Sequence, residues 1–259
     1  MIRLIATDLD GTLLEPDGSM PEGVFEAVRN LDALGIRFAA ASGRQLGNLK
    51  RLFAPVAERM DFICENGAVN VADGEVIGVI PIPRETGLEI ITDIEAFGMD
   101  VLLSGRHTCY VTAENRAFSD DITYRLRNTV TVVDDLRSVP EDFLKISGHA
   151  KQGVNKAAPE LLKKWGNRLT ATVAGWDWFD FTVSDKGKGL RMLLERRGLA
   201  REETMAFGDN FNDESMLSLA GHPYVMERAD AALKKPGVRI CRKVVPILQE
   251  IVKANGRLP

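Results

Sequence analysis

Two aspartates near the start of the chain carry the strongest chemical signal. Asp8 and Asp10 stand one residue apart, after a short apolar run and directly before Gly11. In a β-strand, residues i and i+2 point to the same face, so both carboxylates would be directed to one place. Paired acids can hold a hard cation, attack an electrophile or move a proton. A strand that merely enters an Asp-Gly turn would carry the same residues, so the pair needs support from the rest of the chain.

Two further polar clusters follow other apolar runs. Asp209, Asn210, Asn212 and Asp213 fall within five residues after the strand expected at 204–207, which is more than a helix N-cap needs. Such an oxygen-rich cluster suits Mg²⁺. Ser42-Gly43-Arg44 follows the strand expected at 36–41 and offers a hydroxyl and backbone N–H groups to an anion. A plain N-cap would explain that tripeptide as well.

The elements that position these clusters alternate between strands and helices. Strands are expected at 2–7, 36–41 and 61–64, with helices from residue 21 and over 45–58. This βαβ pattern favours a parallel sheet, and it returns after Gly187 with strands at 204–207 and 223–226. The polar clusters follow the carboxyl ends of these strands, where an open α/β sheet normally builds its site.

The segment from residue 82 to residue 184 has a different pattern. Its strands alternate strictly, as in Phe179, Phe181 and Val183 against polar neighbours. Alternation predicts a sheet with one apolar face, covered on a single side by helices expected at 84–97 and 153–165. We interpret 82–184 as an α+β module inserted into an α/β domain formed by residues 1–81 and 185–259.

The composition limits the classes of binding partner that we expect for this protein. The 259 residues are 45% hydrophobic and 27% charged, with a formal net charge of -4, which gives no electrostatic footprint for nucleic acid or an anionic membrane. The three cysteines lie far apart, so buried thiols are expected rather than a zinc site or a disulfide framework. Neither a signal peptide nor an apolar run of membrane-spanning length is evident. The expected location is cytoplasmic, and the expected partner is a small molecule. The sequence does not indicate the oligomeric state, and a monomer fits it.

Taken together, the motifs resemble those of a known family. Asp8-Leu9-Asp10-Gly11-Thr12-Leu13, Ser42-Gly43-Arg44, Lys186-Gly187 and Gly208-Asp209-x-x-Asn212-Asp213 occur in the order typical of the haloacid dehalogenase (HAD) superfamily. Within that superfamily the chain resembles the Cof-type, subclass IIB sugar phosphatases, and the resemblance covers essentially the whole chain. It implies a Rossmann-like core with a parallel sheet and an inserted α+β cap that closes over the substrate and sets specificity.

The resemblance also implies a catalytic mechanism. Asp8 would be the nucleophile that forms an aspartyl phosphate, and Asp10 would protonate the leaving alcohol and then activate water. The cofactor would be Mg²⁺, held by the carboxylate of Asp8, the carbonyl of Asp10 and the carboxylate of Asp209. Asp213 would support the metal directly or through water.

The transferring phosphoryl group would be bound by Ser42, Gly43, Lys186 and Asn212. Lys186 is preferred over Lys188 because it places two leucines at i+4 and i+7 on one helical face, whereas Lys188 places only a methionine at i+4.

Five further positions have a less definite role. Arg44 and Lys145 are candidates for substrate contact. For Lys145, a solvent-exposed position on a strand without any functional role is an equally good interpretation. The histidines His107, His149 and His222 share no metal-ligand spacing, so surface or capping roles are expected for them.

The predicted reaction is Mg²⁺-dependent hydrolysis of a small phosphomonoester, most of all a sugar phosphate. Two alternatives stay open: a phosphotransferase or mutase on the same scaffold, and a non-catalytic sugar-phosphate sensor. One segment departs from the family, whose members commonly carry Met-Gly-Asn-Ala where this chain has Met226-Glu227-Arg228-Ala229. The contribution of this loop is therefore open.

Overall fold

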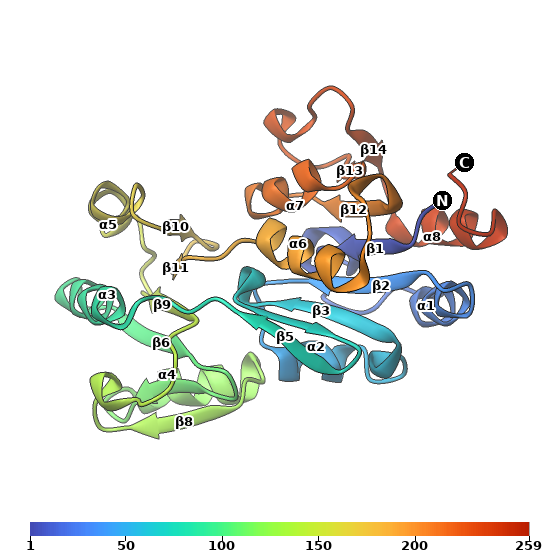
Figure 1. The fold of residues 1–259 in the computed structure, drawn as a ribbon. Coiled ribbons are helices and arrows are strands. Elements are labelled where there is room, and N and C mark those ends of the chain that lie inside the picture. Colours follow the sequence, from blue (N-terminus) through green and yellow to red (C-terminus); the bar gives the residue numbers. More distant parts are fainter. Residues whose placement is uncertain (259) are drawn as a thin grey trace. The chain divides into compact units, whose positions relative to one another are not determined.

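A computed structural model describes residues 1–258 of the chain. The chain divides into two compact units, and Figure 1 shows their elements. The first unit comprises residues 1–78 and the residues from Asp185 on, and the second unit comprises Val79–Ser184.

The first unit is built on an eight-stranded sheet with the order β14-β13-β12-β1-β2-β3-β4-β5. From β14 to β3 all neighbouring strands are parallel, and β4 pairs antiparallel with β3. Asp73 and Gly74 both have positive φ angles, 51° and 81°, as a two-residue hairpin turn between β4 and β5 requires. The strands are β1 (Leu4–Thr7), β2 (Arg37–Ala41), β3 (Met60–Cys64), β4 (Val69–Ala72), β5 (Glu75–Val79), β12 (Thr204–Gly208), β13 (His222–Met226) and β14 (Arg239–Cys241).

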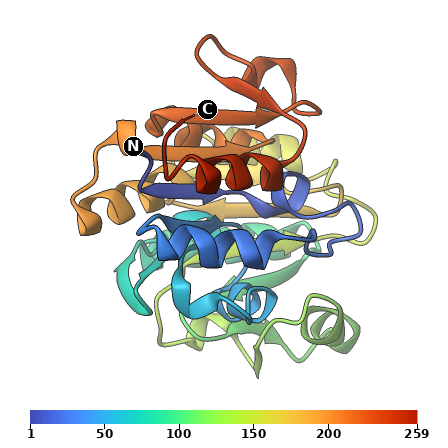
Figure 2. The same cartoon turned by 90° about the vertical axis from the view of Figure 1, so that its right-hand side faces the viewer.

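Helices cover both faces of this sheet. The helices α1 (Val24–Ala33), α2 (Leu46–Leu52) and α8 (Val244–Lys253) lie on one face, where Figure 2 shows α1 and α8 side by side. The opposite face is covered by α6 (Lys186–Arg197) and α7 (Glu214–Leu219), whose leucines join a buried cluster with the alanines of β1, β2 and β12. With both faces buried, the parallel strands are almost uninterruptedly apolar.

Three details of the first unit differ from the sequence prediction. The first helix begins at Val24 rather than at residue 21, because Gly23 before it has a left-handed backbone with a φ of 86°. The helix expected over 45–58 ends at Leu52, because Pro55 lacks a backbone N–H and restricts the residue before it. The edge strand β14 was not predicted. It has three residues, of which only Cys241 is buried, so it shows no alternation that a sequence pattern could reveal.

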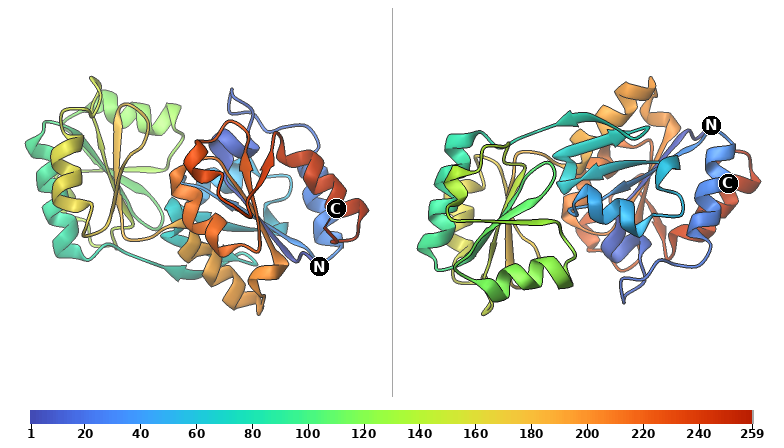
Figure 3. Two further views of the ribbon diagram at one scale, coloured as in Figure 1. Left: turned by 90° about the horizontal axis from the view of Figure 1, so that it is seen from above. Right: turned by 90° about the horizontal axis from the view of Figure 1, so that it is seen from below.

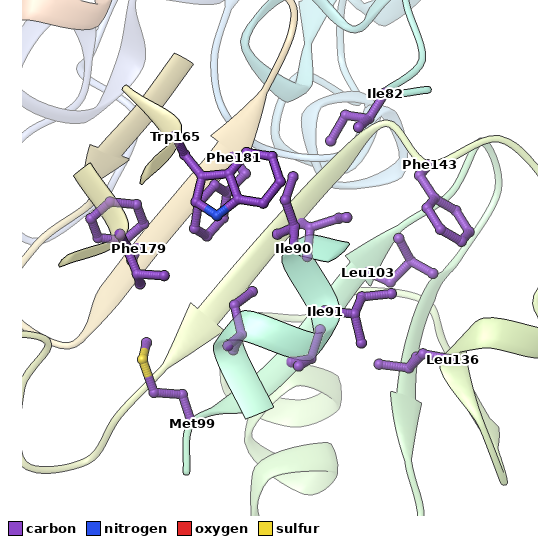
Figure 4. Packing of buried hydrophobic residues seen from close by; sticks show 14 of the residues in the cluster. Ile82, Ile90, Ile91, Met99, Leu103, Leu136, Phe143, Trp165, Phe179 and Phe181 are labelled. Carbon is purple, nitrogen blue, oxygen red and sulfur yellow. The ribbon is translucent and has the colours of Figure 1, made fainter. Parts of the chain in front are cut away.

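The second unit contains a six-stranded sheet with the order β10-β11-β9-β6-β7-β8. Its neighbouring strands pair antiparallel except for β7 with β8, which are parallel. The strands are β6 (Asp100–Ser104), β7 (Cys109–Thr112), β8 (Val130–Val133), β9 (Lys145–His149), β10 (Thr170–Val173) and β11 (Trp178–Thr182). The helices α3 (Arg84–Ala96) and α5 (Ala158–Trp165) pack on one face, and Figure 4 shows Ile90, Ile91, Trp165 and Phe181 in the core between them and the sheet.

The prediction that helices cover only one side of this sheet is wrong. The helix α4 (Arg116–Asp120) and the turn at 121–125 lie on the face opposite to α3 and α5 (Figure 3), where Phe118 and Ile122 pack on Leu102, Cys109 and Val111. The physical reason is the parallel pairing of β7 with β8, because parallel strands need a crossover connection. The other expected helix begins at Ala158 rather than at 153, with Pro159 in its first turn.

The helix α4 also covers His149, for which a surface or capping role was predicted. The residue is 7% exposed at the end of β9. Its ring stacks on Phe118, and its two nitrogens lie 3.6 Å from Asp100 and 3.5 Å from Asp177. The prediction is wrong because α4 supplies an apolar cover that the alternation did not reveal.

The cysteines agree with the expectation of buried thiols, since Cys64, Cys109 and Cys241 are all buried and free. Across residues 1–258, the helices are all too short or too polar to cross a bilayer.

Candidate active site

The acidic residues meet at the carboxyl edge of the first sheet because β1 and β12 are adjacent and parallel. Thr7 of β1 pairs with Phe207 of β12, so the residues that follow the two strands leave the sheet side by side. The backbone N–H of Asp8 continues this ladder and donates to the carbonyl of Phe207 at 2.9 Å. Asp8 is 6% exposed, and Asp209 follows β12 on the neighbouring strand.

Asp8, Asp209 and Asp213 form one cluster, in which each contributes a carboxylate oxygen within 4.8 Å of the others. Asp213 is fully buried, and its Oδ2 accepts the backbone N–H groups of Asp209 at 2.9 Å and Asn210 at 3.1 Å. The short helical turn at 211–213 therefore fixes the position of this carboxylate. Three converging carboxylates are a donor set that fits a hard divalent cation such as Mg²⁺.

Lys186 lies inside this cluster. It is the first residue of α6, its side chain is fully buried, and its Nζ donates to Oδ1 of Asp8 at 2.5 Å and to Oδ1 of Asp213 at 2.6 Å. The side chain of Lys188 is 52% exposed, and its Nζ lies 3.7 Å from Oδ2 of Asp185. Of the two lysines that the sequence offered, the structure brings Lys186 to the acids.

The cluster carries more negative than positive charge. Burial raises the pKa of Asp8 to about 7; Lys186 opposes this shift, and Asp213 and Asp209 add to it. Burial lowers the pKa of Lys186, but the carboxylates of Asp8 and Asp213 outweigh burial and raise that pKa overall. The pKa of Asp209 is raised as well, chiefly by burial. One ammonium thus faces three carboxylates, an imbalance that a bound divalent cation would relieve.

Asp10 differs from Asp8 in its environment. Its side chain is 59% exposed, and the guanidinium of Arg44 holds its carboxylate with both oxygens engaged. Nε of Arg44 donates to Oδ2 at 3.0 Å and the terminal nitrogen donates to Oδ1 at 2.5 Å. Arg44, a predicted substrate contact, is in this structure a bidentate partner of Asp10.

The remaining predicted phosphate-binding residues gather around a third loop. Ser42 is 2% exposed after β2, and its carbonyl accepts the backbone N–H of Asn66 at 3.0 Å. The side chain of Asn66 accepts from Asn212 at 3.4 Å, and a Cβ added to Gly43 would stand 3.3 Å from it. Asn66 was not predicted as a site residue, yet its loop joins Ser42, Gly43 and Asn212.

Thr12 also contributes to the site, although sequence reasoning gave it no role. Its hydroxyl donates to Oδ1 of Asp209 at 2.9 Å. Gly11 beside it has a φ of +92°, and a Cβ there would stand 2.3 Å from Oδ2 of Asp209, so only glycine fits. The signal was present in the Asp-Gly-Thr motif itself.

Lys145 belongs to the second unit, whereas the other candidates belong to the first. Its side chain is 11% exposed, and its Nζ lies 3.8 Å from Oδ2 of Asp180 on the neighbouring strand. It is therefore a mostly buried member of an ion pair, not a solvated strand lysine.

Comparison with known proteins identifies the class that this fold and site define. A profile of the haloacid dehalogenase-like hydrolase family matches residues 5–244, and the chain belongs to that family. This confirms the predicted family and α/β fold. The structure of BT4131, described as a HAD subclass IIB sugar phosphatase, has a TM-score of 0.76 at 24% identity and covers 97% of each chain, which shows the shared fold.

Two curated relatives from Escherichia coli K12 are each 26% identical to the chain. One is YbjI, a 5-amino-6-(5-phospho-D-ribitylamino)uracil phosphatase, aligned over 240 residues that cover 90% of this chain and 88% of the relative. The other is the pyridoxal phosphate phosphatase YbhA, aligned over 249 residues that cover 90% of each.

Proposed function

We propose that the protein is a Mg²⁺-dependent phosphatase that hydrolyses small phosphomonoesters, sugar phosphates most of all, through an aspartyl phosphate on Asp8. The observation that carries this proposal is the buried Asp8–Lys186–Asp213 cluster beside Asp209. The family is a hydrolase family, and the relatives YbjI and YbhA are named as phosphatases of small phosphorylated compounds, which supports the same chemistry.

In the proposed reaction, an oxygen of Asp8 attacks phosphorus, and the bond from phosphorus to the leaving oxygen breaks. Asp10 gives its proton to the departing alcohol, so an acyl phosphate and a neutral alcohol result. Water then attacks the acyl phosphate and passes a proton to Asp10. Inorganic phosphate leaves, and the carboxylate of Asp8 is restored.

The other residues bind and orient the phosphoryl group. The ammonium of Lys186, the hydroxyl of Ser42, the backbone N–H of Gly43 and the amide of Asn212 would offset the charge on its oxygens. Asp8, Asp209 and the carbonyl of Asp10 would hold Mg²⁺, with Asp213 in direct or water-mediated support. When bound, Mg²⁺ supplies positive charge that stabilises the phosphoryl oxygens.

Substrate choice is proposed to depend on residues outside this set. We assign the second unit the role of a cap that sets specificity, with Lys145 as a candidate contact. Arg44 is a candidate for the substrate as well, and in this structure its guanidinium pairs with the carboxylate of Asp10.

A generic aryl phosphate tests the proposed activity. Purified protein with Mg²⁺ is expected to release inorganic phosphate in many turnovers, and EDTA is expected to stop the release. Phosphate that appears instead on an added sugar hydroxyl, detected by product analysis, would favour the phosphotransferase. Binding of sugar phosphates without any turnover would favour the sensor and refute the proposal.

Metal binding can be tested without turnover. Mg²⁺ is expected to raise the melting temperature of the metal-free protein, because a ligand at 100 times its Kd stabilises the native state by about 2.7 kcal/mol. The Asp209→Asn variant should lose most of this stabilisation. The matched control is Asp17→Asn, which changes an exposed acid that accepts hydrogen bonds from Ser19 and is not a member of the cluster, and it should respond like the wild type. Equal Mg²⁺ stabilisation of all three proteins would show that the carboxylate cluster is not the metal site.

A further inference from the structure

Arg228 makes a contact that the proposed mechanism does not use. It follows β13 in the segment that departs from the family pattern, and its exposed guanidinium reaches the loop after β1. Nε donates to the carbonyl of Gly11 at 3.0 Å, and a terminal nitrogen donates to the same oxygen. Two donors on one carbonyl fix that peptide group more firmly than a single hydrogen bond would.

Gly11 lies at the centre of the site. It separates Asp10 from Thr12, whose hydroxyl binds Asp209 at 2.9 Å, and its own backbone lies against the Asp209 carboxylate. The loop cannot shift at Gly11 without moving the acid–base residue on one side or the contact to Asp209 on the other. Arg228 is also near enough to Asp209 to oppose the burial that raises the pKa of that carboxyl.

The segment that carries Arg228 is itself held in place. The carboxylate of Glu227 accepts Nε of Arg242 at 3.0 Å, and the carbonyl of Glu227 accepts Nζ of Lys234 at 2.8 Å. The N–H of Ala229 closes a turn onto the carbonyl of Met226 at 2.9 Å. Arg228 therefore extends from a fixed turn to the loop after β1, past the intervening strand β12.

We propose that Arg228 is a positioning residue for catalysis, which holds the Gly11 carbonyl and thereby orients Asp10 and Thr12 in the proposed reaction. The inference rests on the proposed phosphatase function but concerns a residue that touches neither the acids' reacting oxygens nor the phosphoryl group. It also gives the departing Met226–Ala229 segment a definite role.

The surroundings of Arg228 make the proposal testable by chemical rescue. Arg228 lines a cavity of about 650 Å³, together with Thr12, Glu15, Arg242 and Lys243 among others. Shortening Arg228 to alanine would leave its hydrogen-bonding position next to space that a free guanidinium ion can enter. A small cation of the right shape could then donate to the Gly11 carbonyl in place of the side chain.

The experiment compares Arg228→Ala, Arg228→Lys and the control Lys243→Gln with an aryl phosphate and Mg²⁺. Lys243 lines the same cavity and its side chain is 70% exposed, but its Nζ pairs with Glu15 at 3.6 Å and contacts neither the Gly11 carbonyl nor the turn that carries Arg228. Arg228→Ala is expected to lower kcat by about 10- to 100-fold, since small misplacements of reacting groups reach that size. KM and the melting temperature should change little. Arg228→Lys, which keeps the charge and can keep one donor, should recover part of kcat, and Lys243→Gln should match the wild type.

Guanidinium chloride, at concentrations well below those that unfold the protein, is then expected to raise the kcat of Arg228→Ala. It should not activate the wild type. Sodium chloride at equal ionic strength should leave the kcat of Arg228→Ala unchanged. A wild-type kcat for Arg228→Ala would overturn the proposal. The proposal would also be overturned if Arg228→Ala lost kcat together with melting temperature, and if neither the Arg228→Lys substitution nor added guanidinium recovered kcat. Neither result would contradict the proposed phosphatase function. That function would be contradicted only if the wild-type protein did not release phosphate.

Discussion

Replacement of Asp8 by asparagine is expected to abolish turnover while the fold persists. The amide is nearly the same size as the carboxylate but has no anionic oxygen to attack phosphorus, so no acyl phosphate can form. Loss of a nucleophile in enzymes with covalent intermediates costs on the order of 10⁶ in kcat, and a loss that exceeds the detection limit is expected here. Phosphate release by the Asp8→Asn variant at near the wild-type rate would remove Asp8 from the mechanism.

The same variant has a second, independent signature in its stability. The folded-state pKa of Asp8 is about 7, above the ordinary value of 3.8, so the folded protein holds this proton more tightly than the unfolded chain. In metal-free protein the ionisation of Asp8 therefore costs stability, and this cost grows as the pH rises from about 4 to about 7. We expect the Asp8→Asn variant to lack this contribution and to melt no lower than the wild type at pH 7, measured by calorimetry without Mg²⁺.

Replacement of Lys186 by methionine is expected to damage both activity and stability. The buried ammonium donates to Asp8 and Asp213, and in the proposed reaction it also binds a phosphoryl oxygen. Removal of one such donor costs about 10²- to 10³-fold in kcat. Removal of one partner from a buried ion pair costs about 3–5 kcal/mol, because it leaves uncompensated buried charge. Steady-state kinetics and denaturant unfolding measure the two effects.

Lys188 provides the matched control, since it lies on the same helix two residues away and its side chain is 52% exposed. The Lys188→Met variant should keep kcat and unfolding free energy close to the wild-type values. Equal losses in the two variants, or a loss confined to Lys188→Met, would show that the buried lysine does not have the role assigned to it.

Much of the fold could be predicted because its patterns are local. Apolar runs between polar clusters indicated the parallel strands of the first unit, and the structure has β1, β2, β3, β12 and β13 at those runs. The inserted sheet was harder to predict. Cys109 and Val111 give β7 an apolar face toward α4, and the partner of that face depends on a long-range parallel pairing that no local pattern contains.

The residues of the candidate site also differ in how far the sequence alone could predict them. Asp8, Asp209 and Asp213 were predictable because parallel strands bring their following residues to one edge of the sheet. Arg228 and Asn66 could not be predicted in the same way. Their roles depend on which loop each side chain reaches, and this follows from the order of the strands and the path of each loop, not from residue type or spacing.

The central claim is that Asp8 carries the phosphoryl group. The most direct measurement is acid quenching of the Asp10→Asn variant during turnover of an aryl phosphate with Mg²⁺, followed by mass spectrometry of the peptide that contains Asp8. An aryl leaving group needs little protonation, whereas attack by water needs the base, so the intermediate should accumulate in this variant. The account predicts one alkali-labile phosphoryl group on Asp8. A phosphoryl group on another residue, or unmodified protein although the wild type turns over, would contradict it.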